Sequence, residues 1–185
     1  MTDEALIQAV LEGDDRAVEA LHSRYVDQLF SYVRSQVNDY HDAQELLQDI
    51  LYKVMRNLHA FTGDAAFKTW MYTIARNRII DYYRGTAKRH KEQPAETDVL
   101  EAKSGATGSA ERDAVANSQV AAIHHELAEL PADYYEVLYL RFIEEFSLKE
   151  TASIMKRTFF SVKALQRRAR HELAKRLEEE VTVHE

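Results

Sequence analysis

The strongest structural signal in this 185-residue chain lies in residues 41–58, which read HDAQELLQDILYKVMRNL. The apolar side chains of this segment recur every three or four residues, at Ala43, Leu46, Leu47, Ile50, Leu51, Val54, Met55 and Leu58. That spacing aligns them along one face of an α-helix and leaves charged and amide side chains on the other face. The segment therefore predicts an amphipathic helix that packs through one face and exposes the other.

Similar apolar stripes flank this segment on both sides. Before it, the pattern predicts a short helix from Glu4 to Glu12 and a longer helix capped by Asp14 or Asp15. After it, residues 67–84 (FKTWMYTIARNRIIDYYR) keep helical spacing through Phe67, Trp70, Met71, Ile74, Ala75 and Ile79. Trp70 on this stripe is interpreted as a core anchor, with a contact to a nucleic-acid base as the weaker alternative. Asp81 is expected to pair with its neighbours Arg78 or Arg84.

The character of the chain changes from Gly85 to about Arg112, where large apolar side chains are almost absent. Such a segment cannot offset its ordering entropy, so a flexible linker is expected there. A second helical block follows, with expected helices at Ala114–Glu129, Asp133–Phe142, Leu148–Met155 and Phe159–Leu177. The sequence thus predicts an all-α protein of two small helical domains, 1–86 and 113–185, joined by a linker at 87–112.

Composition excludes several classes of protein. With five Gly and two Pro the chain has few β-turn signals, which favours an almost entirely helical protein over a β-rich one. With no Cys it has neither disulfides nor thiolate metal sites. No apolar run approaches the roughly 20 residues needed to cross a bilayer, and the first residues do not resemble a signal peptide, so a cytoplasmic location is expected.

No catalytic residue, metal ligand or cofactor is expected. His124, His125 and Glu126 lack the spacing of a zinc-binding helix, and no phosphate-binding loop is present. A phosphohydrolase using His41 and Asp42 remains a minor alternative.

The charge is sorted by position. The chain has a net charge of −7, yet residues 66–91 carry seven Lys or Arg and one acid, and residues 156–176 carry eight and one. Two short cationic surfaces on an acidic body indicate two separate contacts with a polyanion such as nucleic acid.

The last two expected helices form a helix-turn-helix pattern. Ser147 and Glu150 make a capping box for the shorter helix, and Lys156 lies in the turn, where a left-handed backbone would cost about 1 kcal/mol. The following helix exposes small, hydroxyl and cationic side chains suited to the major groove: Ser161, Lys163, Ala164, Arg167, Arg168 and Arg170. A solvated basic helix face is the alternative interpretation.

Phe159 and Phe160 are bulky residues at the start of this helix. In order of preference, they are expected to pack under the turn, to touch a thymine methyl group or to mark a site for a protein partner.

Two sets of motifs carry a resemblance to a known family. The run from His41 to Asp49, Asn57 to Phe61, and Phe67 to Arg84 resembles the second conserved region of bacterial RNA polymerase sigma factors. Leu130-Pro131, residues 148–152 and residues 161–170 resemble their fourth region. Since only these two regions and a linker are present, the chain is similar to the small extracytoplasmic-function (ECF) group of the sigma-70 family, from about Ala17 to Leu177.

The resemblance implies a role as a sigma factor, with core RNA polymerase and promoter DNA as partners. A first surface would bind the clamp helices of the largest polymerase subunit through Glu45, Gln48, Asp49, Lys53 and Arg56. A second would contact the minus-10 element through Phe61, Tyr72, Arg76, Asn77, Arg78 and Arg84.

The helix from Phe159 would read the minus-35 element, and its domain would meet the flap region of the polymerase. An anti-sigma factor is a further partner implied by the resemblance. A helix-turn-helix regulator that acts without polymerase, and a protein-interaction bundle, are the alternative functions.

Overall fold

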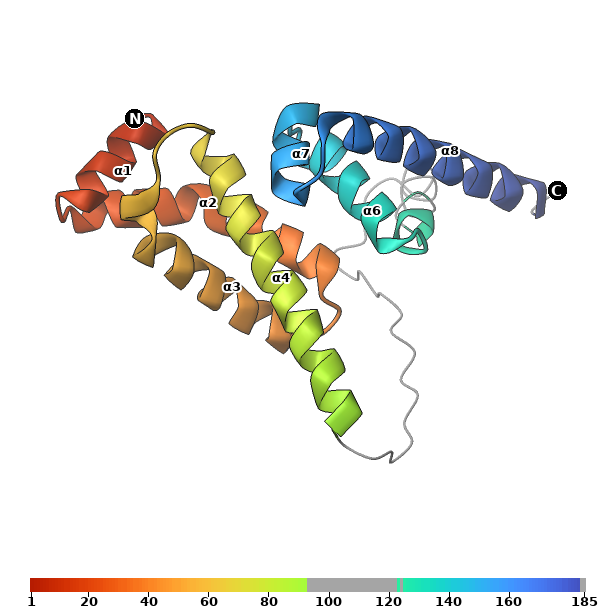
Figure 1. The fold of residues 1–185 in the computed structure, drawn as a ribbon, viewed down its shortest axis with the longest axis horizontal. Helices are drawn as coiled ribbons and strands as arrows, with labels where there is room; N and C mark the ends of the chain where they lie inside the picture. Colours follow the sequence, from red (N-terminus) through yellow and green to blue (C-terminus); the bar gives the residue numbers. More distant parts are fainter. Residues whose placement is uncertain (93–122, 124, 184–185) are drawn as a thin grey trace, which may run out of the picture. The chain divides into compact units, whose positions relative to one another are not determined.

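The structure is a computed structural model that describes residues 1–92, 123 and 125–183, without the side chains of 88–92 and 179–183 (Figure 1). The described residues form helices and no strand, as the sequence predicts. The chain divides into two compact units, Met1–Lys103 and Ser104–Glu185. None of the described helices is both long and apolar enough to cross a lipid bilayer.

The first unit contains four α-helices and one short 3-10 helix within its described residues: α1 Asp3–Leu11, α2 Asp15–Gln36, α3 Tyr40–Arg56, η1 Leu58–Ala60 and α4 Phe67–Glu92 (Figure 1). Side-chain oxygens cap three of them, because Thr2, Asp14 and Asp39 each accept a hydrogen bond from a backbone N–H of the first turn. The chain reverses between α1 and α2 at Gly13, whose φ of 91° is easily reached only by glycine.

A single apolar core joins these helices. Helix α2 contacts α1, α3 and α4, and α3 and α4 also contact each other. The fully buried side chains at the centre come from all five elements and include Leu6, Leu29, Tyr32, Val33, Ile50, Leu58, Met71 and Tyr72. Each large apolar side chain buried in this way contributes about 1.5–3 kcal/mol, so tertiary packing rather than helix propensity holds the unit together.

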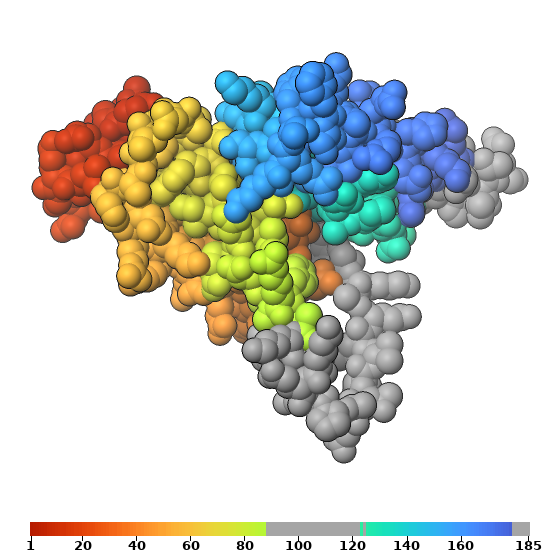
Figure 2. All heavy atoms as spheres, viewed as in Figure 1, coloured from red at the N-terminus to blue at the C-terminus, as the bar shows by residue number. Residues whose placement is uncertain are grey.

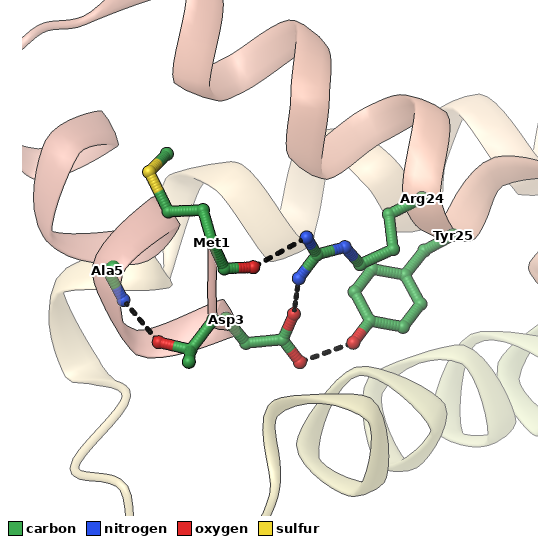
Figure 3. Close-up of polar contacts among 6 residues, drawn as sticks. Met1, Asp3, Ala5, Arg24 and Tyr25 are labelled. Atoms are coloured by element: carbon green, nitrogen blue, oxygen red, sulfur yellow. Dashed lines mark hydrogen bonds and ion pairs between the residues drawn. The ribbon is translucent and has the colours of Figure 1, made fainter.

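A polar cluster fastens α1 to α2 (Figure 3). One carboxylate oxygen of Asp3 accepts a hydrogen bond from Arg24 at 2.5 Å, and the other accepts one from the Tyr25 hydroxyl. Arg24 also donates to the carbonyl oxygen of Met1 at 2.8 Å. Burial, and then the bond to Asp3, raises the pKa of Tyr25. The N-terminus is thereby tied to the core.

Helix α4 continues beyond its expected end at Arg84. Gly85 does not adopt a positive φ, and the Thr86 hydroxyl donates to the carbonyl oxygen of Tyr82 at 3.0 Å, so the helix runs through to Glu92. A glycine weakens a helix but breaks it only when the backbone departs from helical angles. The first residues of the expected linker, 87–92, therefore belong to α4. Residues 93–112 lie outside the described residues.

The second unit is a smaller helical bundle. Its described elements are α6 Ala132–Leu138, a π-helical turn η2 Tyr139–Ile143, α7 Leu148–Met155 and α8 Phe159–Val183. The core side chains are Leu130, Val137, Leu138, Leu140, Phe146, Ile154, Met155, Val162, Leu165 and Ala169. Most of the helix expected at Ala114–Glu129 lies outside the described residues, although residues 125–128 are helical.

The sequence predicts one helix over Asp133–Phe142, whereas the structure has α6 followed by the π-turn. The Glu144 N–H bonds the carbonyl of Tyr139, five residues back, at 3.0 Å. Arg141 braces this turn by donating to the carbonyl oxygen of Phe146 and to Gln166 of α8 at 2.9 Å. These two bonds, one local and one to α8, compensate for the irregular backbone.

The expected helix-turn-helix is confirmed in detail. Helix α7 has the expected bounds, and its capping box is formed by a 2.8 Å bond from the Ser147 N–H to Glu150 and a 3.2 Å bond from the Glu150 N–H to Ser147. Lys156 adopts the left-handed conformation, with φ of 52°. This left-handed residue turns the chain between α7 and α8.

Candidate protein and nucleic-acid interfaces

Helix α3 separates its side chains into two faces. Ala43, Leu46, Ile50 and Val54 are buried against the rest of the first unit. All five side chains assigned by sequence to polymerase binding are exposed: Glu45, Gln48, Asp49, Lys53 and Arg56. This arrangement leaves a largely polar surface on a rigid helix, available to a protein partner.

A shallow hollow of about 400 Å³ lies on the same exposed face. It is lined by Asp49, Tyr52, Lys53, Arg56 and Asn57. Tyr52 is 65% exposed, although large aromatic side chains are usually covered. Tyr52 is not among the residues expected at this surface, although its position off the apolar stripe of α3 indicates that it points outward.

An ion pair links the two surfaces that the sequence assigns to different partners. Arg78 of α4 bonds the carboxylate of Asp49 on α3, and their side chains are 23% and 58% exposed. The expectation that Arg78 or Arg84 pairs with Asp81 is wrong for Arg78. The preference follows from the packing of α4 against α3, which brings together residues 29 positions apart.

Tyr72 is not on the surface of α4, so its expected role as an aromatic contact for DNA needs correction. The side chain has no solvent exposure, and its ring lies 5.0 Å from that of Tyr32. The amine of Lys68 lies 5.6 Å from the centre of the Tyr72 ring. The buried stripe of α4 is rotated from the expected one, because Tyr72 is inside while Trp70 and Ile74 are only half-buried.

Phe61 belongs to an aromatic cluster at the start of α4. Its ring lies 5.6 Å from that of Phe67 and 5.4 Å from that of Trp70. Phe67 is buried, whereas Phe61 and Trp70 are half-buried, and the loop of residues 62–66 is exposed. The cluster thus presents partly open aromatic rings beside an open loop, a combination that can stack on an unpaired base.

The remaining side chains assigned to the minus-10 element differ in exposure. Arg84 is exposed, whereas Arg76, Asn77 and Arg78 are half-buried. The side chains assigned to the minus-10 element on α4 and the loop before it thus include one exposed cation, Arg84, three partly covered polar side chains and the edge of an aromatic cluster.

Helix α8 presents its cations openly. Val162, Leu165 and Ala169 are buried, whereas Lys163, Arg167, Arg168 and Arg170 are exposed and Ser161 and Ala164 are half-buried. Figure 2 shows the blue atoms of α7 and α8 on the open surface of the second unit. Thr158 caps the helix by accepting a 3.2 Å bond from the Ser161 N–H. The result is a capped helix with one apolar face and one cationic face, the form that enters a major groove.

Phe159 and Phe160 do not pack under the turn, as the preferred expectation had it. Their side chains are 43% and 79% exposed, and their rings meet edge to face at 5.7 Å. The residues buried on either side of the turn are Met155 at the end of α7 and Val162 in the first turn of α8. The two rings are left on the surface at the N-terminus of α8.

The described residues contain no group of three His, Asp or Glu side chains that could hold a metal ion. His124, part of the pattern considered in the sequence, is outside the described residues.

Comparisons with known proteins agree with the order of these two units. Residues 21–89 match the family description "Sigma-70 region 2", and residues 127–175 match "Sigma-70, region 4". The RNA polymerase sigma-H factor of Pseudomonas aeruginosa is 29% identical over 181 residues, covering 95% of this chain and 94% of that protein. The ECF RNA polymerase sigma-E factor of Escherichia coli strain K12 is 30% identical over 163 residues, covering 84% of this chain and 83% of that protein.

Two solved structures share the fold. CnrH, in complex with the cytosolic domain of CnrY, has a TM-score of 0.69 at 23% identity and covers 96% of this chain and 97% of its own. RpoE from Bartonella quintana, in complex with the anti-sigma factor NepR, has a TM-score of 0.67 at 21% identity, with coverage of 86% and 96%. Since both regions match in order and a curated sigma-E factor is 30% identical across most of both chains, this chain belongs to the ECF group of the sigma-70 family, the sigma factors that direct transcription initiation by RNA polymerase.

Proposed function

We propose that this sigma factor divides its work among three surfaces, one on each of α3, α4 and α8. The exposed face of α3 docks on the clamp helices of the largest polymerase subunit. Helix α4 and the loop before it hold the unpaired minus-10 strand. Helix α8 reads the minus-35 element as duplex, and its domain contacts the flap region of the polymerase.

The observation that carries this proposal is the sorting of α3 and α8 into a buried apolar face and an exposed polar face. On α3, Glu45 and Asp49 supply carboxylates and Gln48 an amide, which can pair with basic side chains of another helix. On α8 the exposed charged side chains between Phe159 and Arg170 are all cationic, which suits phosphates and guanine edges. The two helices therefore have surfaces of different character, one of mixed charge on α3 and one of cations on α8, which suits two different partners.

The proposed role of α4 needs no covalent chemistry. Sigma factors are not enzymes, and strand opening follows if the protein binds unpaired DNA better than duplex. The half-buried rings of Phe61 and Trp70 offer stacking surface worth about 1–3 kcal/mol per captured base. Family membership sets aside both the phosphohydrolase and the regulator that acts without polymerase.

Binding to core polymerase tests the α3 surface with a matched pair of variants. Glu45→Lys with Gln48→Ala changes the proposed face, and Glu19→Lys with Gln28→Ala makes the same changes at exposed positions of α2. The first variant should bind core polymerase at least about tenfold more weakly in a fluorescence titration, since removing paired polar groups from an interface costs about 2 kcal/mol or more. Equal affinities of the two variants would remove α3 from the interface.

We further propose that an anti-sigma factor covers the same face of α3. RpoE of Bartonella quintana was solved with such a factor, and here Tyr52 lies exposed beside the hollow on α3. An exposed aromatic ring beside a concave polar surface is a common anchor point for a protein partner. If a cognate anti-sigma factor is identified, Tyr52→Ala should weaken its binding, and core polymerase should compete with it.

A further inference from the structure

Two aromatic rings at the N-terminus of α8 are exposed and lie outside the core of the second unit. Phe160 is 79% exposed and Phe159 43%, whereas Phe67 and Phe146 in the two cores are each 3% exposed. An isolated apolar residue on a surface needs no explanation, but two adjacent phenylalanines in edge-to-face contact form a preorganised apolar patch.

The position of Phe160 on the helix places it with the cationic side chains. Residues three, four and seven positions apart lie on the same face of an α-helix. Counted from Phe160, these are Lys163, Ala164 and Arg167, which belong to the proposed DNA-reading surface. The buried stripe of Val162, Leu165 and Ala169 points elsewhere. Phe160 thus forms the first turn of the surface that faces DNA.

The charges around the pair indicate what covers it. No acidic residue occurs between Glu150 and Glu172, while Lys156 and Lys163 lie within four residues of the phenylalanines. Arg157 lies equally near but is paired with Asp133 of α6 at 3.4 Å. Such surroundings favour an anionic partner with an apolar group at close range. On the major-groove edge of duplex DNA, the thymine C5-methyl group is the apolar feature, and it lies between two phosphate backbones.

We propose that Phe160 contacts the methyl group of a thymine in the upstream promoter element, with Phe159 holding its ring in position. Promoter choice by this sigma factor then depends on a thymine at one defined position. The inference rests on the proposed reading of the minus-35 element by α8. The contact with Phe160 would recognise thymine, whereas the cationic side chains of α8 favour guanine and phosphate.

The experiment compares thymine with deoxyuridine, which lacks only the C5-methyl group. Holoenzyme reconstituted from core polymerase and the full chain first selects an upstream element from a randomised pool. Each thymine of the selected element is then replaced singly by deoxyuridine, and open-complex formation is measured. We expect one position at which wild-type holoenzyme loses roughly fourfold, the loss that corresponds to one unburied methyl group.

Two variants show which side chain senses the methyl group. Phe160→Ala holoenzyme should be weaker on the thymine template and show no further loss on deoxyuridine at that position. Lys163→Ala should weaken both templates by the same factor and keep the fourfold difference between them. Phe159→Ala should reduce that difference without abolishing it, as expected of a positioning residue.

The outcomes separate this inference from the function on which it rests. If wild-type holoenzyme selects no upstream element, the proposed reading by α8 fails, and the inference falls with it. If an element is selected but wild type and Phe160→Ala respond alike to deoxyuridine, only the inference is overturned. Weaker core binding by Phe160→Ala, with an unchanged response to deoxyuridine, would also overturn it and place the rings against polymerase.

Discussion

The two cationic helices, α4 and α8, differ in how far their charged side chains are committed to their own domain. On α8, Lys163, Arg167, Arg168 and Arg170 are exposed, and the described residues provide none of them with an ion pair. On α4, Arg84 is exposed, but Tyr72 is core, Arg78 is paired with Asp49, and Arg76 and Asn77 are half-buried. A preformed surface suits rigid duplex, whereas in its proposed role α4 would have to release side chains from its own domain to bind an unpaired strand.

The largest effect expected from this difference concerns Tyr72. Replacing Tyr72 by Ala empties a fully buried aromatic site, so the free energy of unfolding of the first unit should fall by about 3–5 kcal/mol. Phe160→Ala on α8 should change the stability of the second unit by less than about 0.5 kcal/mol, since that ring is exposed. Urea unfolding followed by circular dichroism measures both.

The comparison would break if Tyr72→Ala kept full stability and lost only promoter opening. Tyr72 would then act at the DNA, as the sequence predicts. The contrast between α4, whose side chains are buried or paired within its domain, and α8, whose cations are exposed, would not hold.

A second test removes one exposed cation from α8. Arg167→Ala should lower transcription that depends on the upstream element by about 5-fold to 100-fold if the side chain reads a guanine, the equivalent of about 1–3 kcal/mol. Arg16→Ala, an exposed arginine on α2, serves as the matched control and should have no such effect. If Arg167 contacts only phosphate, the loss will be uniform across promoter sequences. The slope of log binding constant against log salt concentration will then be shallower by about 1.

A third test addresses the pair of Asp49 and Arg78. A double-mutant cycle with Asp49→Ala and Arg78→Ala should give a coupling of about 0.2–1 kcal/mol in the free energy of unfolding, because Asp49 is largely exposed. Asp49→Ala alone should bind a single-stranded minus-10 oligonucleotide more tightly, since Arg78 is released, while binding core polymerase more weakly. Unchanged oligonucleotide affinity would show that Arg78 is not withheld by the pair.

Features set by neighbouring residues could be predicted from the sequence. Ser147 and Glu150 cap α7 as expected, Lys156 takes the left-handed turn, and α8 begins at Phe159, because each depends on residues within one or two turns. The exposed face of α3 follows in the same way from a clear period of three and four residues.

Features that depend on tertiary contacts could not be predicted. The choice between Trp70 and Tyr72 as the buried ring is made by Tyr32 of α2, and the partner of Arg78 by the packing of α4 on α3. The continuation of α4 past Gly85 was missed because a glycine allows a helix end without requiring one. Phe159 and Phe160 were expected inside because no local pattern shows that Met155 and Val162 are the residues buried beside the turn.

The smallest expected effect is a pH dependence at the α3–α4 contact. The Tyr82 hydroxyl of α4 donates to the carboxylate of Asp42 on α3, and burial, followed by this bond, raises the pKa of Tyr82 from 10.0 to about 12. Between these values the unfolded chain has lost the phenol proton while the folded chain keeps it. Because unfolding therefore releases a proton, the free energy of unfolding falls as pH rises. The contribution is fully present below about pH 10 and is lost as pH rises through about 12.

Tyr82→Phe isolates this contribution, because the ring remains and the titrating hydroxyl is removed. The variant should lose stability less steeply than wild type between pH 10 and pH 12 when the unfolding midpoint in urea is followed. Tyr83→Phe is the matched control for the neighbouring phenol, whose pKa burial also raises, and whose hydroxyl donates to the carbonyl oxygen of Gln36 rather than to a carboxylate. If both variants flatten the profile equally, burial alone sets the pH dependence, and the bond to Asp42 adds nothing to the hold of α4 on α3.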